Sequence, residues 1–357
     1  MTDFGEQITA IEKEIRETPY HKGTEHHIGK LRARLARLKD RQLEGEVKSK
    51  GGGGGGGYGV KKQGDATVVL IGPPSAGKST LINKLTNAES KVAAYAFTTV
   101  SVIPGMLKYN DAYIQILDVP GLIEGARQGK GRGREVLSVA RGADLLLIMT
   151  DVDRVEIFET LIKELEDAGI RINTAPPEIR IEKKLQGGIN IQSNLPQTLS
   201  KQTIKEIAME YGMRNADIVL KEKFTLERLL DAFSPSREYL PAIYVVNKID
   251  EGKNPRAENY FHISAETGEG IENLLKEIWG QLKLVKVYLV RPDEDPSFNN
   301  PTIAKEGTSL AQIAESIGPD FAQGKIAARI WGSSAQFPGQ EVPLTTKVSE
   351  GLQLRFV

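Results

Sequence analysis

The strongest constraint on the fold is a glycine-rich string, Gly72-Pro-Pro-Ser-Ala-Gly-Lys78-Ser79, which matches the pattern G-x-x-x-x-G-K-[ST]. In this pattern loop N–H groups converge on phosphate oxygens, the lysine supplies positive charge and the hydroxyl binds magnesium. The apolar residues 67–71 before it predict a buried strand, and residues 79–85 after it predict a helix. The string is therefore predicted to be a phosphate-binding loop between a strand and a helix.

Two further strings follow in order, Asp118-Val-Pro-Gly121 and Asn247-Lys248-Ile-Asp250. A carboxylate such as that of Asp250 accepts hydrogen bonds from the ring N–H and the exocyclic amine of guanine, a pair of donors that adenine lacks. Together the three strings predict a GTP-binding switch protein.

The composition of the chain limits the number of domains and the kinds of site and partner that can be expected. The 357 residues are 39% hydrophobic, which is enough for more than one core, so two or three domains are expected. Basic and acidic residues both number 47, so the net charge gives no sign of a nucleic-acid partner. Cysteine is absent, which excludes disulfides and thiolate metal sites. Without a signal peptide or an apolar run of about 18 residues, we expect a cytoplasmic protein with neither a membrane nor a DNA partner.

The N-terminal residues 1–50 are predicted to form a helical hairpin, and residues 51–64, which contain seven consecutive glycines, a flexible linker. The second helix of the hairpin carries six basic residues beside its apolar face, which we call the basic stripe: Lys30, Arg32, Arg34, Arg37, Lys39 and Arg41. RNA or ribosome contact is one explanation. The other is a solvated helix face whose apolar side packs on the next domain.

Alternating strand and helix patterns over residues 65–168 and 237–283 predict an α/β domain with a parallel sheet. An α+β insert is predicted over residues 169–236. Its strands lie around Gly187-Gly188, and they precede a Ser200-capped helix and a short helix at 225–233. Residues 284–357 are predicted to form a small β-grasp domain, with strands at 285–290, 327–331 and 351–357 and a Ser309-capped helix.

These strings resemble those of the DRG (developmentally regulated GTP-binding) branch of the Obg-like TRAFAC GTPases almost from end to end. The resemblance rests on Thr24–His27, the glycine loop before Gly72, Tyr95–Thr99, Asp118–Ala126, Gly187–Asn190, Asn247–Asp250 and Leu284–Tyr288. It implies a P-loop GTPase domain with an N-terminal helical element, a ribosomal-protein-like insert and a C-terminal TGS domain. It also implies work on a ribosome or rRNA, with room for a dedicated protein partner. An ATPase of the related TGS-bearing branch is disfavoured by Asp250.

The resemblance also implies roles for individual residues. Lys78, Thr99 and Gly121 would act in catalysis. Magnesium would be bound by Ser79 and Thr99, and by Asp118 through water. GTP or GDP would be held by Gly72, Pro73, Pro74, Ser75, Ala76, Gly77, Lys78, Ser79, Thr80, Phe97, Thr98, Thr99, Asp118, Gly121, Asn247, Lys248, Asp250, Ser264 and Ala265.

The chain differs from the best-known switch GTPases at one position that affects GTP hydrolysis. Leu122 stands where the best-known switch GTPases have a glutamine that orients the attacking water, and leucine can neither donate nor accept a hydrogen bond. Intrinsic hydrolysis is therefore expected to be slow unless a backbone group, K⁺ or a partner compensates. Related cation-dependent GTPases carry an asparagine ligand where this chain has Ser75, which weakens the case for direct K⁺ coordination. The alternative is an RNA- or ribosome-binding scaffold with a structural nucleotide and negligible turnover.

Three other candidates are weaker. Glu25-His26-His27 lacks metal-ligand spacing, so capping or surface roles are expected. Trp331 is expected in a core. The glycine-interleaved cations after the second string are expected to form a solvated loop, with phosphate or rRNA contact as the alternative: Arg127, Lys130, Arg132 and Arg134.

Overall fold

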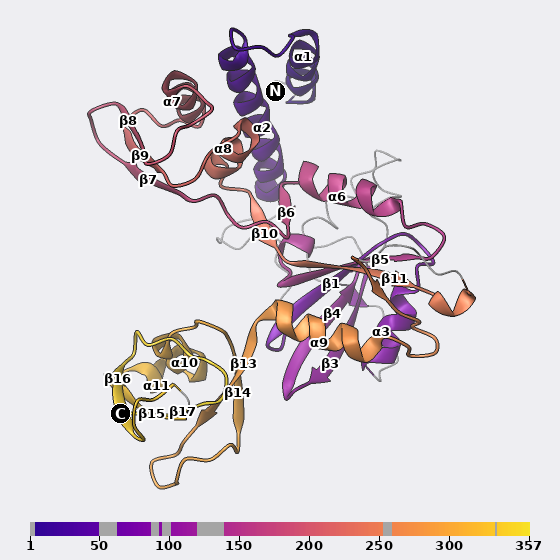
Figure 1. Cartoon of the computed structure of the whole chain (residues 1–357), viewed down its shortest axis with the longest axis vertical. Coiled ribbons are helices and arrows are strands. Elements are labelled where there is room, and N and C mark those ends of the chain that lie inside the picture. The colour runs from indigo at the N-terminus through magenta and orange to yellow at the C-terminus, as the bar shows by residue number, and fades with distance from the viewer. Residues whose placement is uncertain are drawn as a thin grey trace. The chain divides into compact units, whose positions relative to one another are not determined.

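A computed structural model of the chain describes residues 4–49, 63–86, 93–94, 101–119, 139–252, 259–332 and 334–357 (Figure 1). The chain divides into two compact units. One unit consists of Met1–Tyr58 with Gly169–Tyr239, and the other of Gly59–Ala168 with Leu240–Val357. The N-terminal helices therefore group with the insert. None of the helices in the described residues is both long and apolar enough to cross a bilayer.

The second unit contains a seven-stranded sheet. Its strands are, in spatial order, β12 (Phe261–His262), β11 (Ala242–Asn247), β5 (Leu145–Asp151), β1 (Ala66–Ile71), β4 (Ala112–Asp118), β3 (Ser101–Tyr109) and β2 (Ala93–Ala94). The five strands from β12 to β4 run parallel, as predicted. They bring residues that follow β1, β5 and β11 to one edge of the sheet, where α/β proteins bind ligands.

The parallel arrangement predicted for the sheet does not extend to its other edge. There β3 pairs antiparallel with β4, and β2 with β3. Strands β3 and β4 are joined by Asn110-Asp111, whose φ angles of 48° and 68° are those of a tight hairpin turn. Pro104 and Gly105 within β3 obscure its strand pattern in the sequence.

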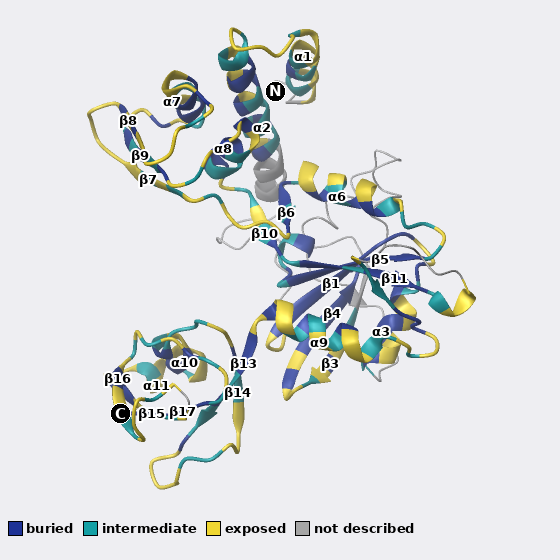
Figure 2. Cartoon of the chain, in the orientation of Figure 1, coloured by how far each residue is buried: buried dark blue, intermediate teal, exposed yellow. Residues whose placement is uncertain are grey.

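The apolar core of this domain lies between the sheet and its helices. Strands β1, β4 and β5 are buried almost throughout, and they appear dark blue in Figure 2. Helices α3 (Lys78–Thr86) and α9 (Ile271–Leu282) bury Leu81, Leu274 and Ile278 in one core cluster with the sheet. Helix α6 (Ile157–Asp167) buries Phe158, Leu161 and Leu165. A wholly apolar run such as 145–149 is therefore a buried central strand.

The first unit combines helices α1 (Phe4–Glu17) and α2 (Glu25–Ser49) with the insert. The insert contains a sheet in the order β7 (Ile179–Lys183), β9 (Ala216–Leu220), β8 (Ile189–Ser193), helices α7 (Lys201–Glu210) and α8 (Leu226–Phe233), and the pair β6 (Ile170–Ile172) and β10 (Glu238–Leu240). Ser200 caps α7 as predicted, because its side chain accepts from the Thr203 N–H. The two predicted strands around Gly187-Gly188 do not pair with each other. The unpredicted strand β9 lies between them.

Helix α2 packs on the insert through its apolar face. Ile28 and Ala33 belong to the same buried cluster as Ile204 and Phe224 of the insert, while Leu31 and Leu38 pack against α1. This agrees with the expectation that the apolar side of the basic helix packs on a neighbouring domain. The domain in question is the insert, which begins at Gly169, 120 positions after the last residue of α2.

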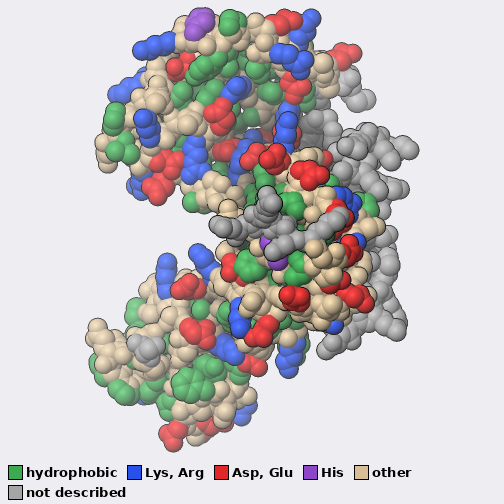
Figure 3. Space-filling view, turned by 45° about the vertical axis from the view of Figure 1, so that its right-hand side comes forward, with side chains coloured by type: hydrophobic (Ala, Val, Ile, Leu, Met, Phe, Trp, Pro, Cys, Tyr) green, Lys and Arg blue, Asp and Glu red, His purple; other side chains and the backbone are tan. Residues whose placement is uncertain are grey.

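Three of the six cations in the basic stripe of α2 are paired with acidic residues of the described chain. Arg32 pairs with Glu227, Lys30 Nζ lies 3.9 Å from Glu210 Oε1, and Lys39 Nζ lies 2.9 Å from Glu12 Oε1. Figure 3 shows Lys and Arg side chains interspersed with Asp and Glu at the top of the view. Arg34 and Arg41 are exposed and have no partner among the described residues. The stripe is therefore a mixed-charge surface with two open cations.

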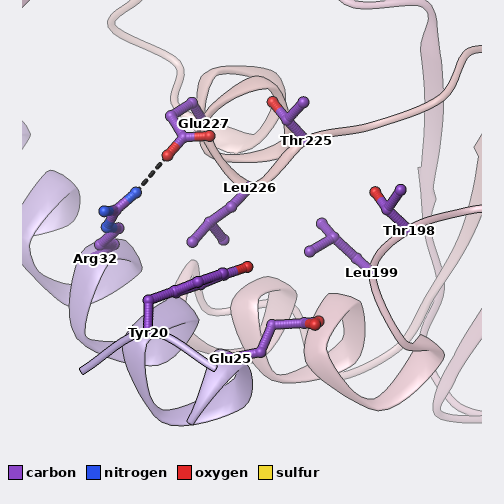
Figure 4. Close-up of a pocket in the computed structure, with 8 residues that line it drawn as sticks. All are labelled: Tyr20, Glu25, Arg32, Thr198, Leu199, Thr225, Leu226 and Glu227. Carbon is purple, nitrogen blue, oxygen red and sulfur yellow. Dashed lines mark hydrogen bonds and ion pairs between the residues drawn. The ribbon is translucent and has the colours of Figure 1, made fainter. Parts of the chain in front are cut away.

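A cleft of about 380 Å³ lies within the first unit, and Arg32 and Glu227 face each other at its side (Figure 4). Its lining residues come from both the hairpin and the insert: Tyr20, Glu25, Arg32, Thr198, Leu199, Thr225, Leu226 and Glu227. The cleft is lined neither by the glycine string nor by Asn247–Asp250, which we call the guanine string.

Residues 284–357 form a β-grasp domain. The sheet order is β14 (Pro301–Lys305), β13 (Leu284–Leu289), β17 (Leu352–Phe356), β15 (Ala327–Trp331) and β16 (Gln340–Pro343), with helices α10 (Leu310–Ile317) and α11 (Pro319–Ala322). Strands β13 and β17 are parallel and the other pairs antiparallel. Ser309 and Gln312 form a capping box at the start of α10. Strands β14 and β16 were not predicted, because they are short and half-exposed.

Candidate functional site

The glycine string forms the loop between β1 and α3, as predicted. At two positions of the loop, atoms of neighbouring strands lie so close to the backbone that a glycine is required. A Cβ at Gly72 would lie 2.0 Å from the Met149 carbonyl oxygen, and one at Gly77 would lie 2.1 Å from Asn247 Nδ2. Gly77 also has a φ of 90°. The loop is thus pressed against the ends of β5 and β11, and only glycine fits at these two points.

Lys78 opens α3 and is buried. Its Nζ donates to the carbonyl oxygens of Gly72 at 3.1 Å and Pro73 at 3.0 Å. The ammonium group therefore lies over its own loop, at the start of a helix whose dipole favours anions. Pro74, Ser75, Ser79 and Thr80 are exposed, whereas Ala76 is buried. The loop presents an open face on one side and packs on the sheet with the other.

Ser79 and Asp118 come together at the ends of α3 and β4. Ser79 Oγ donates to Asp118 Oδ2 at 2.9 Å. Asp118 is only 4% exposed, and its Oδ1 is buried with no hydrogen-bond partner among the described residues. A buried carboxylate oxygen normally has a partner. Hydroxyl and carboxylate oxygens, with room for water, are the ligands that Mg²⁺ prefers, so this pair fits the predicted magnesium site.

The guanine string joins three loops. Asn247 is buried at the end of β11, where its Nδ2 donates to the Ala76 carbonyl at 2.9 Å and its Oδ1 accepts from the Ala265 N–H at 2.8 Å. Lys248 adopts a left-handed conformation with φ 68°, and its Nζ lies 3.6 Å from Glu251 Oε1. Asn247 thus links the phosphate loop, the guanine string and the buried Ser264–Ala265 segment.

Asp250 lies in a short 3-10 turn, η1 (Ile249–Glu251). It is exposed, and it has no hydrogen-bond or ion-pair partner among the described residues. An unpaired carboxylate at this position is available to accept from both guanine donors. The structure therefore brings the phosphate loop, Ser79, Asp118, the guanine string and residues 264–265 to one edge of the sheet.

Several predicted residues lie outside the described residues: Phe97, Thr98, Thr99 and Gly121, as do Leu122 and the cations Arg127, Lys130, Arg132 and Arg134. The two histidines at the start of α2 are paired, His26 with Glu206, and His27 Nε2 with Glu14 Oε1 at 3.0 Å. Trp331 is half-buried, and the Arg355 guanidinium lies 5.4 Å from its ring centroid.

Sequence reasoning missed two residues at this edge, Asp151 and Arg154. Asp151 ends β5 beside Asn247 in register, and it is 7% exposed. Arg154 Nε lies 3.2 Å from both oxygens of Asp151, and its Nη2 donates to the Pro74 carbonyl at 3.0 Å. Burial raises the pKa of Asp151, but hydrogen bonds and charge from Arg154 outweigh it, so the net pKa is lowered. The sequence does contain a signal for Asp151, because this acidic residue ends a largely apolar strand.

Comparison with known proteins agrees with this geometry. The family described as "50S ribosome-binding GTPase" matches residues 67–183, and the "C-terminal region of MMR_HSR1 domain" matches residues 186–284. A GTP-binding protein of Methanocaldococcus jannaschii is 43% identical over 97% of this chain and 90% of its own length. Developmentally-regulated G-protein 3 of Arabidopsis thaliana is 42% identical, over 96% of this chain and 95% of its own. Developmentally-regulated GTP-binding protein 2 of Homo sapiens is 38% identical, over 95% of each chain.

Proposed function

The chain belongs to the developmentally regulated GTP-binding proteins, a family of P-loop GTPases, and we propose that it is a slow GTPase switch that acts on ribosomes in the cytoplasm. The nucleotide part is supported by the convergence of Lys78, Ser79 and the buried Asp118 at the loop. Asp250 is exposed at the same edge and has no partner in the part of the chain that the structure describes. Lys78 would bind the β and γ phosphates. The carboxylate of Asp250 would accept hydrogen bonds from the ring N–H and the exocyclic amine of guanine.

Magnesium supplies charge neutralisation between the β and γ phosphates when it is bound. Ser79 Oγ would be a direct ligand, and Asp118 would bind through water with the oxygen that has no protein partner in the described residues. The Ser79–Asp118 hydrogen bond holds the two side chains near each other beforehand. Ser79 Oγ would therefore bind the metal through a lone pair and could keep its O–H as a donor to Asp118.

The proposed slow rate rests on Leu122. Without a glutamine, the attacking water must be oriented by a backbone group, by K⁺ or by a partner. Ser75 offers one hydroxyl where cation-dependent relatives have an asparagine. We therefore propose that K⁺ accelerates turnover.

The proposed ribosome role is supported by the description of the matching family, "50S ribosome-binding GTPase". Two features of this chain add to it. Arg34 and Arg41 are exposed without partners in the described residues, and a separate β-grasp domain follows the nucleotide domain. Both lie outside the nucleotide motifs, so ribosome contact can be altered without changing the phosphate loop.

Single-turnover hydrolysis of GTP tests the proposal. The rate is measured in NaCl and in KCl at equal ionic strength, with and without purified ribosomes, and Lys78→Ala serves as the inactive control. We expect slow hydrolysis in NaCl, faster hydrolysis in KCl, and further acceleration by ribosomes. Equal hydrolysis rates in NaCl and KCl would show that K⁺ does not accelerate turnover.

Leu122 also favours a second candidate, a ribosome-binding scaffold in which bound nucleotide only stabilises the fold. The same experiment separates the two functions. A scaffold would bind ribosomes in the presence of GTP and show no acceleration of hydrolysis in either salt.

A further inference from the structure

Arg154 lies outside all three nucleotide strings, yet it contacts the phosphate loop. Its Nη2 donates to the Pro74 carbonyl at 3.0 Å, while Nε and Nη2 both hydrogen-bond to the Asp151 carboxylate. The turn that carries Arg154 is itself fixed. The Arg154 N–H donates to the Asp151 carbonyl at 3.2 Å, and the Thr150 hydroxyl donates to the Arg154 carbonyl at 3.1 Å. The guanidinium therefore has a defined position at the edge of the sheet.

The Pro74 carbonyl and the Ser75 N–H belong to the same planar peptide. In a trans peptide these two groups point in opposite directions, and the described residues contain no cis peptide. Holding the carbonyl toward Arg154 therefore turns the Ser75 N–H toward the other side of the loop. This N–H has no acceptor among the described residues, and Ser75 is exposed. It is available to a phosphate oxygen.

The conformation of Ser75 needs outside support. Its φ is 61°, in the left-handed region, which costs a residue with a side chain about 1–2 kcal/mol. Such a backbone persists only where surrounding contacts hold it. A charge-assisted hydrogen bond to the preceding carbonyl is a contact of this kind, and it also polarises the peptide so that its N–H becomes a better donor.

Asn247 makes the equivalent contact two residues further along the loop. Its Nδ2 donates to the Ala76 carbonyl, which belongs to the same peptide as the Gly77 N–H. Asp151 and Asn247 are paired in register at the ends of neighbouring strands β5 and β11. Two peptides of the loop are thus held from outside by side chains of adjacent strand ends, and one of these side chains lies in no nucleotide motif.

We propose that Arg154 is a positioning residue for phosphate binding: anchored by Asp151, it holds the Pro74–Ser75 peptide so that the Ser75 N–H points at the nucleotide phosphates. The role rests on the GTP-binding function of this site. Because the Asp151 carboxylate neutralises the guanidinium, Arg154 contributes orientation and little net charge. Its effect on affinity should therefore depend weakly on salt, unlike that of a cation that contacts phosphate directly.

Calorimetry with GDP and with guanosine, which has the same base and no phosphate, tests this role. Arg154→Ala should weaken GDP binding about tenfold, as expected for one oriented charge-assisted hydrogen bond, and change guanosine binding less than about twofold. Arg154→Lys keeps one donor for the Pro74 carbonyl and loses the paired contact with Asp151, so it should recover part of the affinity. Asp151→Asn should give an intermediate loss.

Lys163→Ala is the matched control, because it removes one positive charge from an exposed position of α6 in the same domain. It should leave GDP affinity unchanged. The titrations are repeated at low and high NaCl, and thermal unfolding of each nucleotide-free variant checks its fold. If Arg154→Ala does not fold, the Arg154→Lys and Asp151→Asn variants carry the test.

Unchanged GDP affinity in the folded Arg154 and Asp151 variants would overturn the proposal. Equal losses for GDP and guanosine would also overturn it, since Arg154 would then only support the fold. Failure of the unmodified protein to bind GDP would instead refute the nucleotide-binding function itself. The expected result is a loss that is specific to the phosphate-bearing ligand and similar in both salts.

Discussion

Helix α2 and the phosphate loop both present basic side chains, but they use them differently. On α2, Arg32, Lys30 and Lys39 each lie within ion-pair distance of a glutamate from another element. In the loop, Lys78 Nζ hydrogen-bonds to two carbonyl oxygens of its own loop. A carboxylate carries a full charge and neutralises its partner, whereas a carbonyl carries only a partial one. These two contacts of Lys78 lie within one loop and involve partial charges, whereas Arg32 connects α2 to α8 through a full charge.

Cations on α2 thus connect two elements, whereas the loop cation hydrogen-bonds to its own loop. Sequence alone does not separate these two kinds of cation, since six basic residues on one helix look more like an anion-binding surface than one lysine does. Four experiments sharpen or break this distinction.

The largest effect is expected for Lys78→Ala. Removing the ammonium group should weaken GDP binding by about a hundredfold, because its charge-assisted contact with phosphate is lost in a buried position. Lys84→Ala is a suitable control, since Lys84 lies on the same helix and donates to the Glu266 carbonyl. Calorimetry measures both affinities. Normal GDP binding by Lys78→Ala would mean that the site is assigned wrongly.

A large loss of stability is expected for Asp40→Ala in the first unit. Asp40 is 5% exposed and accepts from the hydroxyls of Ser234 and Ser236, with Arg237 Nη1 at 3.4 Å. Leaving these donors without their acceptor should cost about 2–4 kcal/mol of unfolding free energy in this unit. GDP affinity should not change.

Hydrogen exchange of residues 169–239 gives a direct readout of that loss. Tryptophan fluorescence cannot report on the stability of the first unit, because Trp279 and Trp331 both lie in the other unit. Unchanged protection of residues 169–239 in the variant would show that Asp40 does not connect α2 to the insert energetically.

A smaller effect, on ribosome binding, distinguishes the open cations from the paired ones. Arg34→Gln with Arg41→Gln should weaken cosedimentation with ribosomes and lower the slope of log affinity against log salt by about one unit per lost phosphate contact. Arg32→Gln with Arg37→Gln removes the same charge from residues that contact Glu227 and the Glu210 carbonyl, and it should have a weaker effect. Equal behaviour of both pairs and the parent would make the whole stripe a solvated face.

The smallest effect is expected for the ion pair between Arg32 and Glu227. Both side chains are more than a third exposed, so a double-mutant cycle with alanine should give a coupling of about 0.2–1 kcal/mol. Denaturation at low and high salt measures it. A coupling several times larger would show that the pair, and not the apolar contact of Ile28 with the insert, fixes α2.

Much of the nucleotide site was predictable because its chemistry is local. Gly72, Gly77, Lys78 and Ser79 lie within eight consecutive residues, since a loop that wraps around phosphates must supply its N–H groups from neighbouring positions. Helices with strong caps were also predictable, as Ser200 and Ser309 show. Strands β2, β9, β14 and β16 were missed, because short or half-exposed strands have a weak period of two. Strand β3 was missed because Pro104 and Gly105 obscure its pattern.

The nucleotide chemistry, the alternation of strands and helices, and the apolar face of α2 can be inferred from residues close together in the sequence. The tertiary structure is needed to find what that face packs on and which cations are paired: Arg32 meets Glu227 across 195 positions of sequence. It also placed Arg154 against Pro74, 80 positions away. The physical reason is that periodicity records the burial of a face, while its partner depends on how distant elements pack. Hydrogen bonds between strand ends exist only once β1, β5 and β11 lie side by side.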